Sequence, residues 1–301
     1  MTPYTQIGLN IRKTWLLFTI FLVVIIGLGW FLSYYFVNQN ILFVAIIFSF
    51  FMSFISFWYS DKIVLAISKA KPLKHNDNPG LYHIVENLCI TAGLPVPKIY
   101  VINEPAPNAF ATGRNPKHAV VAVTLGLIEK LDRSEIEGVI AHELSHIGNR
   151  DILISTVVVV LVGFIVMFSD FFLRMSFFGG RRRDNREGKG ELDAIMIIIG
   201  VLGAILSPII AKLIQLAISR KREFLADASG VMLTRYPDGL ASALAKISQD
   251  QNSLRAANKA TAHLYIASPF KGRQAKGWLV HLFSTHPPIE ERIKRLKEIN
   301  I

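Results

Sequence analysis

Two histidines and a glutamate stand close together in the stretch VIAHELSHIGNRD, which runs from Val139 to Asp151. His142 and His146 are four residues apart, so on a helix both imidazoles lie on one face, one turn apart. This spacing suits two ligands of a single Zn²⁺ ion. Glu143 follows the first histidine directly, where it can take a proton from water at the metal. The pattern therefore predicts a zinc site with Glu143 as general base.

A helix is expected around these residues. Ser134 and Glu137 match a capping box, in which the two side chains bind the backbone at the helix start. Apolar residues then recur at helical spacing up to Ile147. The alternative is a polar helix end that carries its histidines by chance, and the capped, apolar helix favours the metal site over it.

A catalytic zinc site needs a third protein ligand and one open position. No histidine follows His146 until His263, so a glutamate on a second helix is the natural choice. Glu223 fits, and Asp227 lies one turn later on the same face, where it is expected to accept the ring N–H of His142. The alternative is that both are solvated charges beside the basic cluster at 220–222, and spacing alone supports either interpretation.

The composition indicates membrane segments. Hydrophobic residues make up 51% of the 301 residues and the mean hydropathy is +0.39, which is high for a soluble protein. In a membrane protein, a net charge of +11 indicates loops beside anionic lipid on the cytoplasmic side. The basic residues are scattered without a binding motif, so nucleic acid is not expected as a partner.

The apolar runs predict two helical hairpins. No Asp, Glu, Lys or Arg occurs from Thr14 to Ser60, and only the polar turn Asn38–Asn40 interrupts this stretch. A second pair of apolar runs follows the histidines. Four apolar helices are therefore expected, at 14–37, 41–59, 152–169 and 194–211.

The basic residues predict the orientation of these helices. Arg12 and Lys13 precede the first span, and four lysines between Lys62 and Lys74 follow the second, which places both regions in the cytoplasm. The second hairpin returns the chain to its starting side, so Glu223 can meet the histidines. The loop around Arg181–Arg183 opposes the positive-inside tendency, and the sequence leaves open whether the second hairpin crosses the bilayer or only dips into it.

Four motifs resemble one known family. They are NAFATG (108–113), AHELSHIGNRD (141–151), SRKREFLAD (219–227) and STHPPIEERI (284–293). The sequence is similar to the HtpX-like membrane zinc metalloproteases, distant relatives of the CAAX prenyl proteases. The resemblance implies one Zn²⁺ per chain on His142, His146 and Glu223, with Glu143 as catalytic base. It also implies an endopeptidase of membrane and misfolded polypeptides, serving stress response and protein quality control in the bacterial inner membrane.

The resemblance gives two further segments expected roles. Asn108, Ala109, Phe110 and Ala111 are expected to form an edge strand to which an extended substrate pairs. Core packing by Phe110 is the alternative. His286 is expected to donate to the oxyanion formed during peptide attack, with helix capping or an exposed loop position as the alternative. The remaining histidines, at 75, 83, 118, 263 and 281, are interpreted as structural or solvent-exposed.

The expected fold is a mainly α integral membrane protein, with four apolar helices and a cytoplasmic α+β zincin-type protease domain that holds a small β-sheet. Strands are predicted at 98–102, 109–112 and 118–124. The predicted division is a membrane hairpin (1–60), the first half of the protease domain (61–151), a second hairpin (152–219) with a flexible basic loop (176–191), and the second half (220–301).

Two other functions are weighed against this one. A CAAX-type prenyl-protein protease is the nearer alternative, although those relatives carry more membrane spans than the four expected here. A non-catalytic membrane scaffold or metal transporter is the other. A transporter places ionisable residues inside its spans, and the first two spans have none. A scaffold would be expected to lose Glu143 or a ligand residue.

Overall fold

The structure is a computed structural model that describes residues 3–164, 220–255, 257, 261–269 and 287–299. The predicted apolar run 194–211, the basic loop 176–191 and His286 lie outside the described residues. Domain boundaries in those parts stay predictions.

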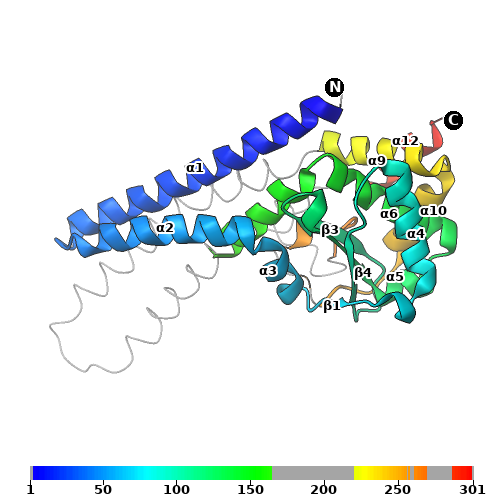
Figure 1. The fold of residues 1–301 in the computed structure, drawn as a ribbon, viewed down its shortest axis with the longest axis horizontal. Helices are drawn as coiled ribbons and strands as arrows, with labels where there is room; N and C mark the ends of the chain where they lie inside the picture. Colours follow the sequence, from blue (N-terminus) through cyan, green and yellow to red (C-terminus); the bar gives the residue numbers. More distant parts are fainter. Residues whose placement is uncertain (1–2, 165–219, 256, 258–260, 270–286, 300–301) are drawn as a thin grey trace.

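Two long helices form the predicted N-terminal hairpin. Helix α1 spans Pro3–Tyr35 and α2 spans Asn40–Trp58, and both are long and apolar enough to cross a membrane. The Asn38 side chain accepts a hydrogen bond from the Asn40 backbone at 3.0 Å and shapes the turn between them. The hairpin projects from one side of the molecule, beyond the mass of sheet and helices (Figure 1). The first two predicted spans are therefore confirmed as candidate membrane helices.

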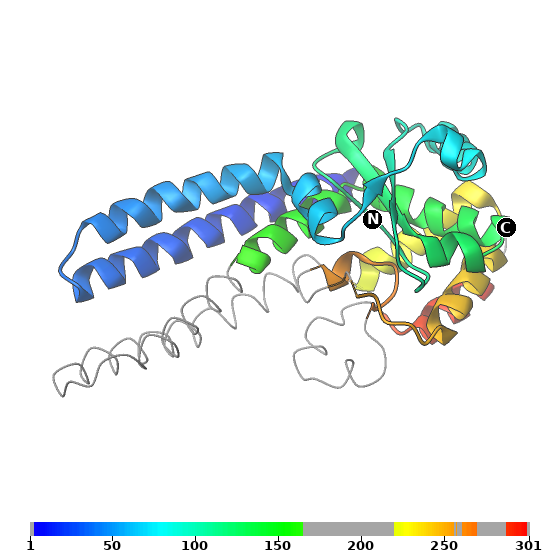
Figure 2. The same ribbon diagram turned by 90° about the horizontal axis from the view of Figure 1, so that it is seen from below.

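The described part of the third apolar run, Asp151–Phe164, is helical and bent by 84° from the helix before it. Its apolar side chains are buried, and Val157 and Leu161 pack against Phe18 of α1. Figure 2 shows this green helix lying beside α1. Within the described residues, the structure thus has two candidate spans, or three if the bent pair counts as one broken span. The expectation of four apolar helices is not confirmed.

A four-stranded mixed sheet supports the site. Its strands are β1 (Lys71–Pro72), β2 (Lys98–Ile102), β3 (Ala109–Gly113) and β4 (Ala119–Thr124), in the order β1-β2-β4-β3. Strands β2 and β4 are parallel, whereas β3 pairs antiparallel with β4, Ala111 facing Val121. The predicted strands are confirmed, and β3 lies at an edge of the sheet.

Helix α6 spans Arg133–Gly148 and carries the histidines. The other helices are α3 (Ser60–Ile67), α4 (Pro79–Ala92), α5 (Leu125–Lys130), α9 (Arg220–Thr234), α10 (Pro237–Gln249) and α12 (Ile289–Lys297). Single 3₁₀ turns lie at His75–Asp77 (η1), Pro116–His118 (η2) and Ala262–Leu264 (η4). Helix α6 contacts α4, α9, α10 and β3, so it lies at the centre of the core.

The cap of α6 differs from the prediction. Asp132 is the N-cap residue, and its side chain accepts from the Glu135 backbone, while Glu135 accepts from the Asp132 backbone. The predicted capping box at Ser134 and Glu137 was therefore wrong by two residues. Asp caps a helix as well as Ser does, and Glu135 gains further partners in Ser242 and Lys246 of α10. The corrected cap thus ties α6 to α10.

Candidate metal and catalytic site

Helices α6 and α9 lie close together and join the two halves of the predicted site. Gly230 of α9 faces the backbone of α6, where an added Cβ would lie 3.0 Å from the backbone nitrogen of His142. A larger residue would hold the helices apart. This close packing brings Glu223, on the first turn of α9, to the two histidines one turn apart on α6.

Three potential ligand atoms converge on one point. The Nε2 atoms of His142 and His146 lie 3.2 Å apart, and the Glu223 carboxylate lies 3.8 Å from the first and 3.6 Å from the second. Two ligands about 2.0–2.1 Å from an ion at tetrahedral angles lie about 3.3 Å from each other. The two carboxylate distances end on different oxygens, Oε2 and Oε1 of Glu223, so either oxygen can face an ion. The separations of the two imidazole nitrogens and this carboxylate are compatible with a tetrahedral metal ion that keeps one position for water or substrate.

Carboxylates hold both imidazole rings from behind. Asp227 lies 2.9 Å from Nδ1 of His142, as the sequence predicted, and Asp151 lies 3.0 Å from Nδ1 of His146. The carboxylate accepts a hydrogen bond from the Nδ1–H group, which keeps the proton on Nδ1 and leaves the lone pair on Nε2. Both Nε2 lone pairs then point at the same place, an arrangement that a cation stabilises. Asp151 closes the AHELSHIGNRD motif but has no role in the site predicted from the sequence.

Arg292 of α12 is a second residue that the sequence analysis missed. Its side chain is fully buried and donates two hydrogen bonds to Asp227, of 2.7 and 2.9 Å. A third bond of 2.8 Å reaches the backbone oxygen of Ile266, and the guanidinium lies 3.7 Å from Glu223. A signal was present: Arg292 stands at helical spacing from Ile289 and Leu296, so a charge occupies the apolar face of α12.

Burial and neighbouring charges together determine the pKa values of the site residues. It raises the pKa of Glu143 to about 7, although a backbone hydrogen bond from Ala111 opposes the rise. A base with a pKa near 7 is suited to proton transfer at neutral pH. Burial lowers the pKa of His146, but Asp151 and Glu223 outweigh it and raise that pKa to about 9. The pKa of His142 is lowered, because burial outweighs Asp227.

The comparisons with known proteins decide the family. The sequence profile of peptidase family M48 matches residues 75–300, three quarters of the chain. The chain belongs to peptidase family M48. It is 46% identical to a protease HtpX homolog of Caldanaerobacter subterraneus subsp. tengcongensis, over 100% of this chain and 99% of that protein. It is 47% identical to one of Thermococcus kodakarensis, over 95% and 96%, and 43% identical to one of Tropheryma whipplei, over 98% of each.

These relatives confirm the resemblance to HtpX-like proteases and make the M48 protein a membrane metallopeptidase. Among solved structures, Ste24p of S. mikatae aligns with a TM-score of 0.48 and 20% identity, over 85% of this chain and 58% of that one. So distant a likeness carries no argument about substrate. The scaffold and transporter alternatives give way to the enzyme.

The M48 site encloses a small cavity of about 30 Å³, large enough for a water molecule. Glu143 and the three potential ligands line it, together with Ala111 of β3 and the segment His263–Ile266. His263 is buried and lies 3.2 Å from the backbone oxygen of Ser155 through Nε2. The sequence grouped this histidine with structural or exposed ones; its burial beside the cavity makes it part of the site wall.

Strand β3 has both a side chain packed in the core and a backbone edge directed away from the sheet. Phe110 is fully buried and packs edge-on against Tyr265, so it belongs to the core. The backbone of Ala109 faces away from β4, and its oxygen accepts from Ile266 at 3.0 Å. Asn108 donates to the oxygen of Ala267 at 3.0 Å. The segment 266–267 therefore covers the start of the β3 edge. The backbone of Ala111, two residues after Ala109, also points away from β4.

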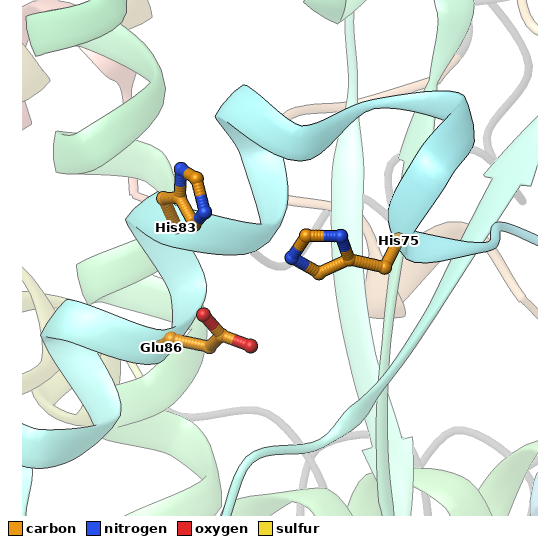
Figure 3. A group of neighbouring side chains, drawn as sticks. All are labelled: His75, His83 and Glu86. Carbon is orange, nitrogen blue, oxygen red and sulfur yellow. The ribbon is translucent and has the colours of Figure 1, made fainter.

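A second group of histidines lies on the surface of this M48 protein. His75 of η1, His83 and Glu86 of α4 point toward one another, with ligand atoms within 4.8 Å (Figure 3). Both histidines are exposed, as the sequence predicted, and within the described chain no carboxylate bonds to either ring. In the buried group the two rings are closer, with centroids 4.7 Å apart against 5.5 Å on the surface, and two carboxylates and Glu143 lie beside them. The buried group is therefore the candidate catalytic centre.

Proposed function

We propose that the protein is a zinc endopeptidase in which His142, His146 and Glu223 hold one Zn²⁺ and Glu143 is the general base. The observation that carries this is the convergence of three ligand side chains: the two Nε2 atoms are 3.2 Å apart, and a Glu223 oxygen lies 3.8 Å from one and 3.6 Å from the other. A carboxylate also holds each imidazole ring from behind. Two imidazoles and a carboxylate are the donor set of catalytic zinc sites in peptidases. When bound, the ion supplies a Lewis acid that polarises a carbonyl and lowers the pKa of water.

Each residue of the chain has a defined task in this scheme. Glu143, buried beside the ligands, takes a proton from the attacking water and later passes it to the leaving amine. Asp227 and Asp151 keep their histidines in one tautomer and one orientation. Arg292 holds Asp227 in place and brings positive charge to the Glu223 side of the cavity. His286 remains a predicted oxyanion donor.

The proposed substrate is an extended polypeptide that pairs with the edge of β3. Ala111 supports this because it lines the cavity of Glu143 and its backbone points away from β4. Asn108 and Ala109 are engaged by the segment 266–267, so pairing that includes them displaces that segment, whereas pairing at Ala111 does not.

Membrane and unfolded proteins are the proposed substrate class, with the site on the cytoplasmic side of the bacterial inner membrane. Two observations support this. The candidate spans lead directly into α3 through residues 59–60, so the catalytic domain begins where the second span ends. The flanking lysines follow the positive-inside tendency. Processing of prenylated proteins is the alternative that the same experiment tests.

The test uses zinc-loaded, detergent-solubilised full chain with two substrates, an unfolded polypeptide and a prenylated peptide. We expect cleavage of the unfolded polypeptide, abolished by a chelator and restored by zinc. Glu143→Gln should keep zinc and lose cleavage, whereas Glu223→Ala should lose zinc. His83→Ala, on the surface group, is the matched control and should keep catalytic zinc and activity. Activity of Glu143→Gln at the wild-type rate would contradict the assigned base, and cleavage of the prenylated peptide alone would favour the alternative.

A further inference from the structure

A hollow of about 510 Å³ lies at the end of α2, where the chain leaves the second candidate span. Its walls come from four parts of the fold: the last turn of α2, the first turn of α3, the start of β2 and the turn that follows β3. The lining side chains are Phe54, Trp58, Tyr59, Asp61, Lys62, Lys98, Arg114 and His118. This hollow is separate from the metal site, with which it shares no lining residue.

Positive charge predominates in the hollow. Lys62, Lys98 and Arg114 face one carboxylate, Asp61, which leaves an excess of two positive charges before His118 is counted. Within the described chain, no carboxylate lies within 4.0 Å of any of these three cations. His118 is occupied, since its Nδ1 lies 2.9 Å from the Asn115 side chain. The three cations are therefore available to an anionic ligand.

Aromatic rings hold two of the cations in place. The Arg114 guanidinium lies over the Trp58 ring, 4.3 Å from its centroid, and the Lys62 ammonium lies 5.2 Å from the centroid of Tyr59. Such cation–π contacts are attractive and favour one position of each cation. They leave the N–H groups free to donate, so the cations are both positioned and available for hydrogen bonds to phosphate oxygens.

The hollow lies at the end of a candidate span, where a membrane-spanning helix would meet the lipid headgroups. Tryptophan and tyrosine collect at that level, because their rings are apolar at one end and polar at the other. Trp58 and Tyr59 end α2 and remain about half exposed, at 45% and 47%. Phe54, one turn further into the span, is 55% exposed. An apolar surface therefore continues from the charged hollow along the span.

We propose that this hollow binds the headgroup of an anionic phospholipid. Lys62, Lys98 and Arg114 would contact the phosphate, Trp58 and Tyr59 the glycerol region, and Phe54 the upper acyl chain. A phospholipid matches both halves of the surface, whereas a free phosphate would use only the cations. Basic side chains at a membrane surface each contribute to the binding of anionic lipid, and the hollow adds a fixed geometry to that attraction.

The lipid site is joined rigidly to the edge strand of the catalytic domain. Arg114 follows Gly113, the last residue of β3, which has a φ of +133° and lies against the backbone of His118. A Cβ at Gly113 would come within 2.3 Å of the His118 oxygen, so the turn admits only glycine there. A bound lipid would thus hold the end of β3 at the membrane surface. This consequence rests on the proposed function of β3, whereas the lipid site itself does not.

The experiment measures lipid binding to the full chain carrying Glu143→Gln, so that catalysis does not enter the result. Purified protein in detergent is titrated with phosphatidylglycerol or phosphatidylcholine, and bound lipid is counted by native mass spectrometry. We expect preferential binding of phosphatidylglycerol. Arg114→Gln and Lys98→Gln, on different elements, should each lower its affinity about five-fold, and the two together roughly twenty-five-fold. Lys117→Gln removes an exposed charge from the same turn outside the hollow and should leave the affinity unchanged.

Three outcomes would overturn the proposal. Equal affinity for the two lipids would show that the headgroup charge is not recognised. An equal loss from Lys117→Gln and Arg114→Gln would show that only the general surface charge matters. Displacement of phosphatidylglycerol by inorganic phosphate at equal concentration would make the hollow a phosphate site. Failure of the proposed peptidase activity would leave all these measurements unaffected.

Discussion

Arg292 and Asp227 form a buried pair joined by two hydrogen bonds, although they lie 65 residues apart on α12 and α9. The pair stands directly behind His142, whose Nδ1 lies 2.9 Å from the same Asp227 carboxylate. Burial raises the pKa of Asp227, but Arg292 and His142 outweigh it and hold that pKa below its usual range. The chain thus supports its metal site from a helix that holds none of the predicted ligands.

Replacing Arg292 should be strongly destabilising. Arg292→Ala leaves the Asp227 carboxylate buried without its cation, a change that costs about 3–5 kcal/mol in comparable buried pairs. Thermal unfolding in detergent should show the loss. Lys294→Ala is the matched control, because Lys294 is exposed on the same helix and forms no ion pair among the described residues. Equal stability of the two variants would contradict the role given to Arg292.

Removing both members of the pair separates its structural role from its role at the metal. The double variant Arg292→Met with Asp227→Asn has no unpaired buried charge, so much of the stability should return. The amide oxygen of the Asp227→Asn side chain still accepts a hydrogen bond from the His142 N–H, but it is a weaker acceptor than a carboxylate. Zinc affinity should therefore stay about 10–100-fold below wild type. Competition with a chromogenic chelator measures the zinc affinity. Wild-type zinc affinity in a stable double variant would show that Asp227 acts on folding alone.

Asp151 should matter as much to zinc binding as Asp227. It lies 3.0 Å from Nδ1 of His146, and Asn10 of α1 donates to it at 2.7 Å. Asp151→Asn should lower zinc affinity about 10–100-fold, because the ring loses its charged acceptor. Asp238→Asn removes an exposed carboxylate from α10 and should bind zinc as wild type does. Equal affinity of the Asp151 and Asp238 variants would rule out the role given to Asp151.

The sequence determined those parts of the site that depend on local spacing. His142, Glu143 and His146 share a helix, so their geometry follows from a period of 3.6 residues, and the strands followed from their own alternation and turn residues. Glu223 was reached by elimination and topology, and spacing alone supported a solvated charge equally well. In the structure Glu223 is buried and lies near both histidines, which speaks against a solvated charge and supports the proposed ligand.

Most of the contacts that were missed join distant segments; the contact of Asp151 with His146, five residues apart, is the local exception. Arg292 to Asp227, Ile266 to Ala109 and Asn10 to Asp151 span 65, 157 and 141 residues, and no local pattern encodes such distances. The shifted cap of α6 has a similar cause. Two overlapping patterns, Asp132–Glu135 and Ser134–Glu137, were both acceptable locally, and the partners of Glu135 on α10 favour the first. Tertiary contacts decided between equal local choices.

The acid limb of the pH–rate profile should report the protonation of the Glu143 carboxylate. A general base acts only when deprotonated, so activity is retained above its pKa and lost as the pH falls through it. Burial raises that pKa to about 7, and a cation bound beside Glu143 favours the carboxylate, so the limb should lie at or below pH of about 7. The kcat/KM for a peptide is measured from pH 5 to 9 with zinc in excess. Along the acid limb it should fall about ten-fold for each pH unit that the pH is lowered. A constant kcat/KM throughout would contradict a base that titrates between pH 5 and 9.

Zinc affinity should itself depend on pH, through His146. Its pKa of about 9 means that a proton occupies the ring below that pH, and the metal must displace it. The affinity for zinc should therefore rise at least ten-fold per pH unit between pH 6 and 8, because the proton that competes with the metal for His146 is lost. Asp151→Asn removes the main cause of the raised pKa and should flatten this dependence. Equal slopes in wild type and variant would contradict the role of Asp151 in setting it.

Gly230→Ala should separate the half-sites without touching a ligand. The new Cβ would lie 3.0 Å from the His142 nitrogen and 3.2 Å from the Ala141 carbonyl carbon, so α9 must move away from α6. Such overpacking costs about 1–3 kcal/mol, and the shift carries Glu223 away from the histidines. Zinc affinity should fall with stability. Gly148→Ala on α6 is the matched control, since its Cβ would meet only the Leu94 side chain at 3.8 Å, and helix propensity favours the change. A Gly230→Ala variant with unchanged zinc affinity would show that the approach of α9 to α6 does not set the ligand geometry.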